Sequence, residues 1–400
     1  MMDIKPLIPA SRTASIKYAI RDIIVLADEV AKTGKEMMYL NIGDPNVYDH
    51  VTPPHLIEAA HKAMLANNNG YAPSSGVPEA IQSIENDARN KGIENILDIF
   101  VTTGASEAIE ICLTALINPG DNFLMPTPGY PLYTAVQSKL ELEPNPYYLD
   151  EENGWQPDID DIRRKVNDRT RAIVLINPNN PTGSILSRDS LLAIIDIAIE
   201  HNLLIIADEI YDKLLFDGKE HISIASLNKD VSCVTFSGLS KNYVMPGFRI
   251  GWGVASGNRK HMANFLDAVN KILRARICAN HPLQYAIPAA LDGKQDHIAS
   301  MIKTLERRRG IMMDILKDVD GIDLVKPEGA FYAFPKIDVL DDMKFTAELI
   351  KETGVVIVPG AGFGQKPGSA HFRTVLLPPE DVIEKSFKLI ADFYRNYKEV

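Results

Sequence analysis

The sequence predicts an α/β protein in which a mainly parallel sheet covered by helices is followed by a smaller α+β part. Between about residues 101 and 255, short apolar runs rich in β-branched residues alternate with longer amphipathic runs, which is typical of strand–helix units on a parallel sheet. After about residue 282 the chain changes to long charged helical stretches with short strands between them. With 400 residues, of which 46% are hydrophobic, the chain can bury the cores of two domains.

The individual elements follow from the same patterns. We expect strands at residues 123–125, 172–176, 203–207, 231–236 and 250–254, with helices at 107–116 and 191–201. In the second part we expect a helix over 302–318 and strands at 330–335 and 355–358. An amphipathic run at 20–31 has no strand of its own to cover, so we assign it to the second part. The predicted large domain spans 47–290, and the small domain combines 1–46 with 291–400.

The charge balance argues against polyanionic partners. The chain has 42 Lys and Arg against 53 Asp and Glu, a formal charge of -11, and no basic stripe that would follow a nucleic-acid backbone. We therefore expect neither nucleic acid nor a membrane as a partner. The first nine residues lack the apolar core of a signal peptide, and no apolar run approaches the length of a bilayer span, so we expect a cytoplasmic protein.

The cysteines and histidines predict neither a disulfide framework nor a metal site. Cys112, Cys233 and Cys278 lie far apart and form no Cys-x-x-Cys pair, so core thiols are the expected state. The nine histidines show no metal-ligand spacing, and we interpret His281 and His371 as ordinary histidines. We expect no metal.

Lys241 is the first candidate for chemistry. It follows the apolar run 231–236, and Arg249 lies eight residues after it. A lysine amine attacks a carbonyl only when it is unprotonated, and burial beside another positive charge favours that form. Arg249 would also grip two oxygens of a phosphate with its planar fork. The alternative, a solvated lysine with a surface arginine, stays open on this segment alone.

Three loops that follow predicted strands carry further candidates. Segment 102–107 runs from a strand into a helix, and its small residues, with Ala105 and Ser106 among them, would let backbone N–H groups at the helix N-terminus approach a phosphate. The same residues also make a plain helix cap. Tyr130 follows a strand in a proline-rich turn and would stack on a flat ring or simply pack there. Asn180 lies in a loop stiffened by Pro178 and Pro181, which would aim its side chain at an oxygen.

Asp208 and Tyr211 complete the pattern. An unpaired carboxylate at the end of the buried strand 203–207 is unfavourable, so Asp208 needs a cation, which a protonated ring nitrogen would supply. Tyr211, three residues later, would bond an oxygen on the same ring. An amine, a phosphate grip, a stacking ring and partners for a ring nitrogen and a ring oxygen together describe pyridoxal 5′-phosphate.

With these motifs and with segments 39–45 and 371–373, nearly the whole chain resembles the class I and II aminotransferases, which are fold-type-I pyridoxal-phosphate enzymes. The segments 18–22, 155–163 and 331–336 look most like those of microbial alanine aminotransferases. The resemblance implies a three-layer αβα large domain with a mainly parallel seven-stranded sheet, plus a smaller α+β domain built from both termini.

The resemblance also implies roles toward the cofactor. Lys241 would form the Schiff base, Asp208 would pair with the pyridinium, Asn180 and Tyr211 would contact the ring oxygen, and Tyr130 would stack on the ring.

Other matching positions concern the phosphate. Arg249, Ala105 and Ser106 match phosphate contacts, and Tyr71 matches a tyrosine that reaches the phosphate of the neighbouring subunit, which implies a homodimer with shared active sites. Many relatives carry a Ser or Thr three residues before the lysine, where this chain has Gly238. Ser237 or Ser240 would substitute, and the sequence leaves both open.

The substrate side is also read from the resemblance. Arg373 and the backbone of Gly43, helped by Asn180, match the clamp on the substrate α-carboxylate. Tyr18 and Arg21 are candidates near the entrance of the cleft, where Arg21 would meet the second carboxylate of glutamate.

The predicted activity is ping-pong transamination between L-alanine and 2-oxoglutarate, giving pyruvate and L-glutamate. Lys241 would anchor the cofactor and move the proton, and Asp208 would keep the ring nitrogen protonated. An aspartate or aromatic aminotransferase, a C–S β-lyase on the same fold, or a non-catalytic regulatory domain that binds the cofactor stays open. A nicotinamide-dependent dehydrogenase is disfavoured, because 360–365 fails the Gly-x-Gly-x-x-Gly fingerprint at its last glycine.

Overall fold

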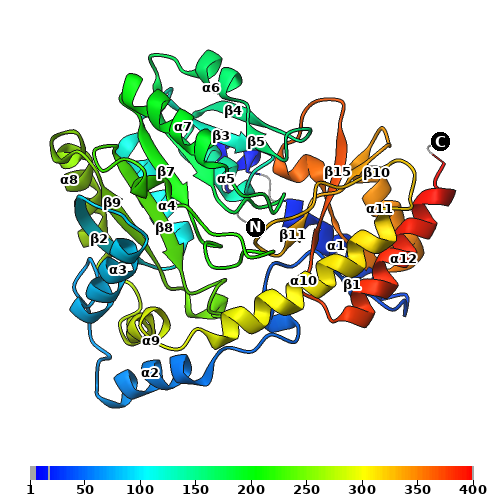
Figure 1. Cartoon of the computed structure of the whole chain (residues 1–400), viewed down its shortest axis with the longest axis horizontal. Coiled ribbons are helices and arrows are strands. Elements are labelled where there is room, and N and C mark those ends of the chain that lie inside the picture. The colour runs from blue at the N-terminus through cyan, green and yellow to red at the C-terminus, as the bar shows by residue number, and fades with distance from the viewer. Residues whose placement is uncertain (1–5, 17–18, 399–400) are drawn as a thin grey trace, which may run out of the picture.

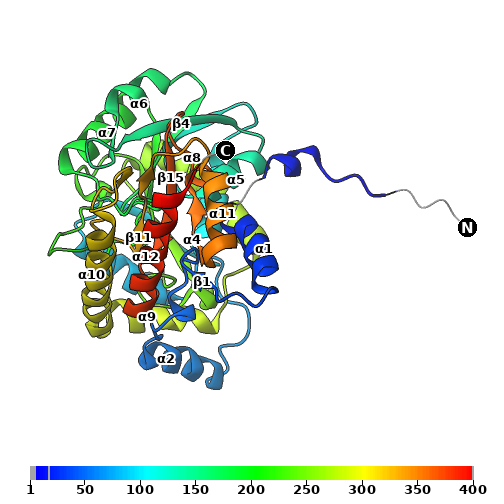
Figure 2. The ribbon, with the colours of Figure 1, turned by 90° about the vertical axis from the view of Figure 1, so that its right-hand side faces the viewer.

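The computed structural model describes residues 6–16 and 19–398, except for the side chains of residues 15 and 19–22. It places one large sheet with its helices beside a second group of smaller sheets and helices (Figure 1). Figure 2 shows residues 6–10 extending away from the rest of the chain, whereas the short helix η1 (Ser11–Ser15) that follows them contacts residues 131–139. Among the described residues, no helix combines the length and the apolar character needed to cross a bilayer.

The large sheet has eight strands in the order β2-β9-β8-β7-β6-β3-β4-β5. Neighbouring strands from β8 through β7, β6 and β3 to β4 are all parallel, whereas β9 runs antiparallel to both β8 and β2. The strands are β2 (Ile96–Thr102), β3 (Asn122–Thr127), β4 (Glu143–Asp150), β5 (Gln156–Pro157), β6 (Thr170–Ile176), β7 (Leu204–Asp208), β8 (Cys233–Gly238) and β9 (Gly251–Ser256).

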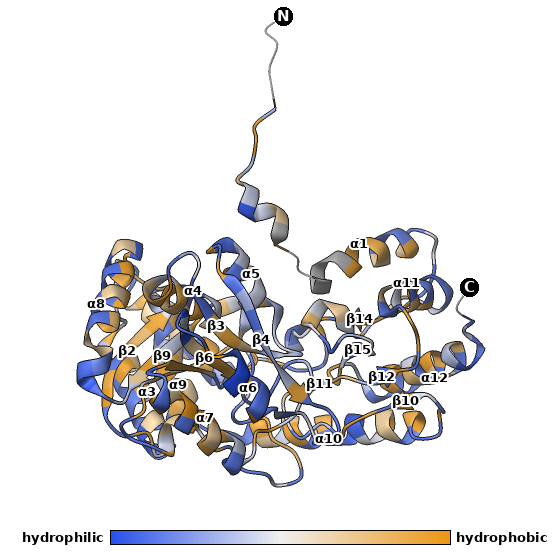
Figure 3. Ribbon diagram, turned by 90° about the horizontal axis from the view of Figure 1, so that it is seen from above, coloured by the Kyte–Doolittle hydropathy of each residue, from blue (hydrophilic) through white to orange (hydrophobic). Residues whose placement is uncertain are grey.

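Both faces of this sheet are buried, which makes three layers. On β6, Val174 packs with α4, α5 and α8, whereas its neighbours Ile173 and Leu175 belong to the core on the opposite face, with α3 and α7. Strands buried on both faces are continuous apolar runs, and these strands appear hydrophobic in Figure 3. The helices of this part are α2 (Pro54–Leu65), α3 (Pro78–Asn90), α4 (Ala105–Leu116), α5 (Pro131–Lys139), α6 (Ile159–Lys165), α7 (Arg188–Glu200), α8 (Arg259–Arg276) and α9 (Ala286–Leu291).

The second part joins segments from both ends of the chain. β1 (Met38–Tyr39) pairs in parallel with β13 (Val355–Val356), and α1 (Ala19–Ala31) packs against α11 (Asp342–Thr353). A five-stranded sheet centres on β15 (Ala370–Val375), which pairs with β11 (Tyr332–Ala333), β12 (Lys336–Ile337) and β14 (Val358–Pro359), while β10 (Ile322–Asp323) pairs with β12. The long helices α10 (Asp296–Leu316) and α12 (Glu380–Asn396) lie side by side (Figures 1 and 2).

The predicted α/β class with a mainly parallel sheet is confirmed. Each predicted strand of that sheet overlaps an observed strand, and the two differ by at most two residues at either end. The sheet has eight strands instead of seven, because the two-residue β5 turns back onto β4. Sequence patterns did not indicate β4, since Pro144 and Pro146 argue locally against a strand. The domain boundaries at 46/47 and 290/291 stay a prediction.

Candidate active site

A cavity of about 420 Å³ lies at the carboxyl ends of the parallel strands. β3, β6, β7 and β8 lie side by side in one direction and all end at this edge, which is where open α/β sheets bind ligands. Eleven of the predicted site residues line the cavity: Gly43, Ala105, Ser106, Tyr130, Asn180, Asp208, Tyr211, Ser240, Lys241, Arg249 and Arg373. A larger cavity of about 640 Å³, between the β4–β5 region and β12, contains none of them.

Lys241 follows β8 directly and is held by the segment after β1. Its Nζ donates a hydrogen bond of 2.7 Å to the carbonyl oxygen of Gly43. The pKa of Lys241 is lowered to about 8. Burial is the main cause, and the charges of Arg373 and Arg249 act in the same direction, whereas those of Asp44 and Asp208 oppose the shift. With that pKa, about a tenth of the lysine amines are unprotonated at pH 7. The amine is therefore suited to attack a carbonyl near neutral pH.

Asp208, the last residue of β7, is 3% exposed. Its carboxylate accepts two long hydrogen bonds of 3.3 Å, from the hydroxyl of Tyr133 and from the backbone N–H of Ile210. Burial raises the pKa of Asp208 to about 6. No cationic side chain of the described residues forms an ion pair with it, so the site offers a buried carboxylate to a cationic group of a ligand.

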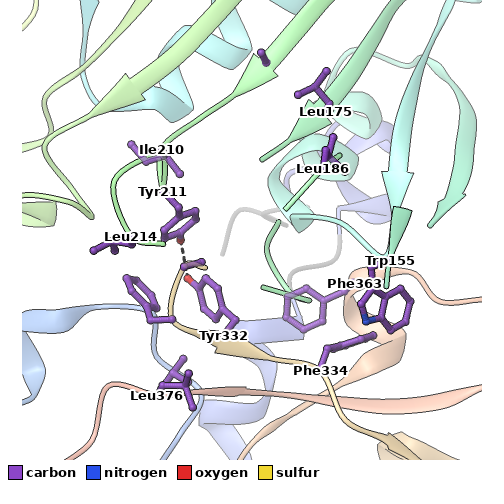
Figure 4. Packing of buried hydrophobic residues seen from close by; sticks show 14 of the residues in the cluster. Trp155, Leu175, Leu186, Ile210, Tyr211, Leu214, Tyr332, Phe334, Phe363 and Leu376 are labelled. Carbon is purple, nitrogen blue, oxygen red and sulfur yellow. Dashed lines mark hydrogen bonds between the residues drawn. The ribbon is translucent and has the colours of Figure 1, made fainter. Parts of the chain in front are cut away.

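Two further polar side chains lie near this carboxylate. Asn180 is 4% exposed and lines the cavity, and its Oδ1 has no hydrogen-bond partner among the described residues. Tyr211 lies in the turn after β7, and its hydroxyl is 2.9 Å from the hydroxyl of Tyr332 (Figure 4). Burial raises the pKa of Tyr211 well above its ordinary value, so the phenol keeps its proton and can donate it to an oxygen.

Arg249 and the first turn of α4 form an anion-binding corner. The Arg249 guanidinium donates to Ser106 Oγ at 3.0 Å, next to the N-terminus of that helix. Gly104 precedes the helix with φ +76°, and a Cβ there would overlap the Arg249 guanidinium. Arg249 itself has φ +52°, a conformation that non-glycine residues adopt rarely and that often occurs at functional sites.

The two serines near Lys241 differ in position. Ser240 lines the cavity, whereas Ser237 lies within β8 and does not. A Cβ on Gly238 would lie 2.8 Å from the carbonyl oxygen of Ile250 and 3.0 Å from the Cα of Gly251, so the close β8–β9 contact leaves no room for a side chain at this position. The geometry explains the glycine and makes Ser240 the serine with access to a phosphate.

Arg373 lies at the opposite wall, on β15. It is 1% exposed, and its guanidinium lies between the rings of Tyr332 and Phe363, at 4.8 Å from each ring centre. It also donates to the backbone carbonyl of Asn41. Because the guanidinium lies over two aromatic rings and donates to a backbone carbonyl, its orientation at the cavity wall is constrained, and its planar fork suits a carboxylate.

Besides Ser237, three predicted residues are not brought to this cavity by the described part of the chain. Tyr71 lies after α2, is 83% exposed and does not line the cavity. Tyr18 lies outside the described residues. Arg21 is in α1, but its side chain is outside the described part, whereas Ile24 of the same helix does line the cavity.

The structure adds three residues whose roles sequence reasoning missed. Tyr332 lines the cavity and Tyr133 bonds Asp208, yet in the sequence both resemble ordinary core aromatics. Asp44 also lines the cavity, and its carboxylate raises the pKa of Lys241. Its place in the segment 39–45, beside Gly43, was the one available signal for it.

These features fit pyridoxal phosphate. Gly104 leaves space for the Arg249 guanidinium at a helix N-terminus, as a phosphate requires, and the buried carboxylate of Asp208 matches a protonated ring nitrogen. Tyr211 and Asn180 have hydrogen-bonding capacity for a ring oxygen, and Lys241 supplies the amine for an aldehyde.

Comparison with known proteins agrees with the geometry. The family model for aminotransferase class I and II matches residues 35–385. The chain is 38% identical to the glutamate-pyruvate aminotransferase AlaA of Escherichia coli K12, covering 99% of this chain and all of that protein. It is 36% identical to an alanine aminotransferase of Mycobacterium bovis, covering 98% and 93% of the two chains.

Solved structures give the same result. The alanine aminotransferase from Pyrococcus furiosus superposes with a TM-score of 0.94 at 38% identity, covering 98% of this chain and all of that one. The predicted resemblance, fold type and pyridoxal-phosphate dependence are confirmed at the level of the family. The chain belongs to the class I and II aminotransferases, a family of pyridoxal-phosphate enzymes.

Proposed function

We propose that this enzyme transfers an amino group between L-alanine and 2-oxoglutarate, giving pyruvate and L-glutamate. The observation that carries the proposal is a single cavity in which a lysine of lowered pKa, a buried carboxylate and two arginines face one another. The choice of alanine and glutamate is supported by the names of two relatives, a glutamate-pyruvate aminotransferase and an alanine aminotransferase.

When bound, pyridoxal phosphate supplies an aldehyde that receives the amino group and a ring that takes up the electron pair of the Cα–H bond. We assign Lys241 Nζ to remove the proton from Cα and to deliver it to the carbon that carried the cofactor's aldehyde, because its amine is partly unprotonated near neutral pH. Asp208 holds the proton on the ring nitrogen. Arg249, Ser106 and Ser240 bind the phosphate.

On the substrate side, Arg373 binds the α-carboxylate, because its guanidinium is held over two aromatic rings at the cavity wall. Gly43 and Asn180 complete that end of the site. Arg21 is assigned to the second carboxylate of glutamate and 2-oxoglutarate, with Tyr18 beside it, and this assignment rests on the sequence. If Arg21→Ala leaves the glutamate half-reaction intact, the Arg21 role is wrong.

We further propose a homodimer with shared sites. Tyr71 is 83% exposed and contributes nothing to the cavity of its own chain, and Leu65 of α2 near it is 75% exposed. A partner subunit that covers this surface would place Tyr71 at the neighbouring phosphate. Sedimentation should give a dimer. In a hybrid dimer of Tyr71→Phe with a variant inactive at Lys241, the site that keeps Lys241 would receive the native Tyr71 of the other subunit. That site should therefore bind pyridoxal phosphate more tightly than the sites of the Tyr71→Phe homodimer.

The decisive experiment is the visible spectrum of the purified holoenzyme. L-Alanine and L-glutamate should each bleach the cofactor band, and 2-oxoglutarate should restore it. A response to L-aspartate or L-tyrosine alone would keep the transamination and change the substrate. Continued release of pyruvate and ammonia from an L-cysteine thioether, with no 2-oxo acid present, would indicate a C–S β-lyase. No response to any amino acid would indicate a regulatory domain.

The cytoplasmic location stays a prediction. It is supported by the cysteines, since Cys112 and Cys233 are buried free thiols, as expected in a reducing compartment. Cell fractionation with detection of the native chain tests it.

A further inference from the structure

Tyr332 links the two halves of the site. It belongs to β11, which pairs with the arginine-bearing strand β15 with Tyr332 opposite Val375. Its hydroxyl lies 2.9 Å from that of Tyr211, 121 residues away in the chain, and both side chains are almost fully buried (Figure 4). The same ring lies under the Arg373 guanidinium. One phenol therefore contacts a residue assigned to the cofactor and a residue assigned to the substrate.

The position of the Tyr332 phenol is closely fixed. Its ring stands nearly perpendicular to that of Tyr211, at 86° with 5.7 Å between centroids, and Phe331 packs on both rings. A Cβ on Gly43 would overlap the Tyr332 hydroxyl, and the carbonyl of Gly43 is the acceptor for Lys241 Nζ. The hydroxyl thus has little freedom to leave Tyr211.

Counting protons gives the direction of the hydrogen bond between the two tyrosines. Each hydroxyl has one proton to donate. If Tyr211 donates its proton to the ring oxygen of the cofactor, it can only accept from Tyr332. Burial keeps Tyr211 protonated, so its own proton is available for the ring oxygen. Hydrogen bonds in such a chain polarise one another. A bond donated by Tyr332 to Tyr211 therefore strengthens the bond that Tyr211 donates to the ring oxygen.

We propose that Tyr332 is a positioning residue that directs the hydroxyl proton of Tyr211 toward the cofactor's ring oxygen and strengthens that hydrogen bond. The inference rests on the proposed function, because it takes Tyr211 to be the partner of that oxygen. A hydrogen bond donated to the ring oxygen draws negative charge from it. The nitrogen of Lys241, which would lie beside this oxygen when it is bonded to the cofactor, then holds its proton less tightly.

The test is a spectroscopic pH titration of the holoenzyme without substrate, following the protonation midpoint of the cofactor's visible band. Tyr211→Phe should raise the midpoint by about one pH unit, the equivalent of one hydrogen bond to a charged group. Tyr332→Phe should raise it by about a third as much, since it removes only the support behind that bond. Added to Tyr211→Phe, it should produce no further shift.

Tyr147→Phe is the matched control. Its hydroxyl is equally buried and donates 2.8 Å to the carbonyl of Val174, away from the cavity, so its removal should leave the midpoint unchanged. An unchanged midpoint in Tyr332→Phe, or an equal shift with and without Tyr211, overturns the inference and leaves the proposed function standing. An unchanged midpoint in Tyr211→Phe overturns the inference together with the assignment of Tyr211 to the ring oxygen.

Discussion

The substitution Asp208→Asn should stabilise the cofactor-free protein at alkaline pH and destabilise the holoenzyme. The carboxylate is buried, its two hydrogen bonds are long, and no described cation pairs with it. In the apoprotein the charge is therefore unfavourable, whereas bound cofactor would supply a positive ring nitrogen. Asparagine keeps the shape of the side chain and removes the charge.

The magnitude follows from the pKa of Asp208, which burial raises from 3.8 to about 6. A folded-state pKa above the unfolded value means that stability is greatest below about pH 4 and falls as pH rises through about 6. Fully ionised, the buried carboxylate costs about 3 kcal/mol relative to the protonated form. About half of that, roughly 1.4 kcal/mol, should develop between pH 5 and pH 8.

The assay is urea unfolding of the apoproteins at pH 5 and pH 8, at one fixed protein concentration because a dimer's stability depends on it. The free energy of unfolding of Asp208→Asn minus that of the native protein should rise by roughly 1.4 kcal/mol between the two pH values. Any effect of asparagine on packing is independent of pH and cancels in this comparison. Saturating pyridoxal phosphate should stabilise the native protein more than the variant.

Asp161→Asn provides a control of opposite sign. Lys165 and the backbone N–H of Tyr148 hold the pKa of Asp161 below its usual value, so its carboxylate stabilises the fold at neutral pH, and this contribution is lost only as pH falls through its folded pKa. Asp161→Asn should therefore destabilise at pH 8. If the Asp208→Asn difference is the same at pH 5 and pH 8, the buried carboxylate carries no cost of ionisation, and the reasoning fails.

Three further outcomes are expected. Gly104→Ala should weaken retention of pyridoxal phosphate at least tenfold, measured by equilibrium dialysis, because its Cβ would displace the Arg249 guanidinium; retention like that of the native enzyme would contradict the phosphate role of this corner. Ser240→Ala should lower cofactor affinity by about 1 kcal/mol, whereas Ser237→Ala should leave it unchanged, and equal effects would remove the distinction based on cavity access. The rate at which the apoprotein takes up the cofactor, followed by absorbance, should rise with pH along a titration curve whose midpoint is near 8, the pKa of Lys241. A steady rise up to pH 10 would indicate an ordinary solvated lysine.

Local sequence was sufficient where the signal is local. The strands β6, β7 and β8 are continuous apolar runs because both faces of the sheet are covered, and the residues that follow them had to meet at one edge of a parallel sheet. That rule alone brought Asp208 and Lys241 into one predicted site. It failed for β4, whose prolines are tolerated only because of where that strand lies in the sheet.

The sequence by itself therefore determined the fold class, the cofactor chemistry and most of the residues that line the cavity, because these depend on the order of strands and on side chains placed at their ends. Only the tertiary structure decided contacts between distant segments: Lys241 with Gly43, 198 residues apart, and Tyr211 with Tyr332, 121 apart. It also decided between Ser237 and Ser240, because the close approach of β9 to β8 is set by packing between strands. The physical reason is that hydrogen bonding and burial act through space, and no local pattern reveals which distant aromatic residue will be brought beside the site.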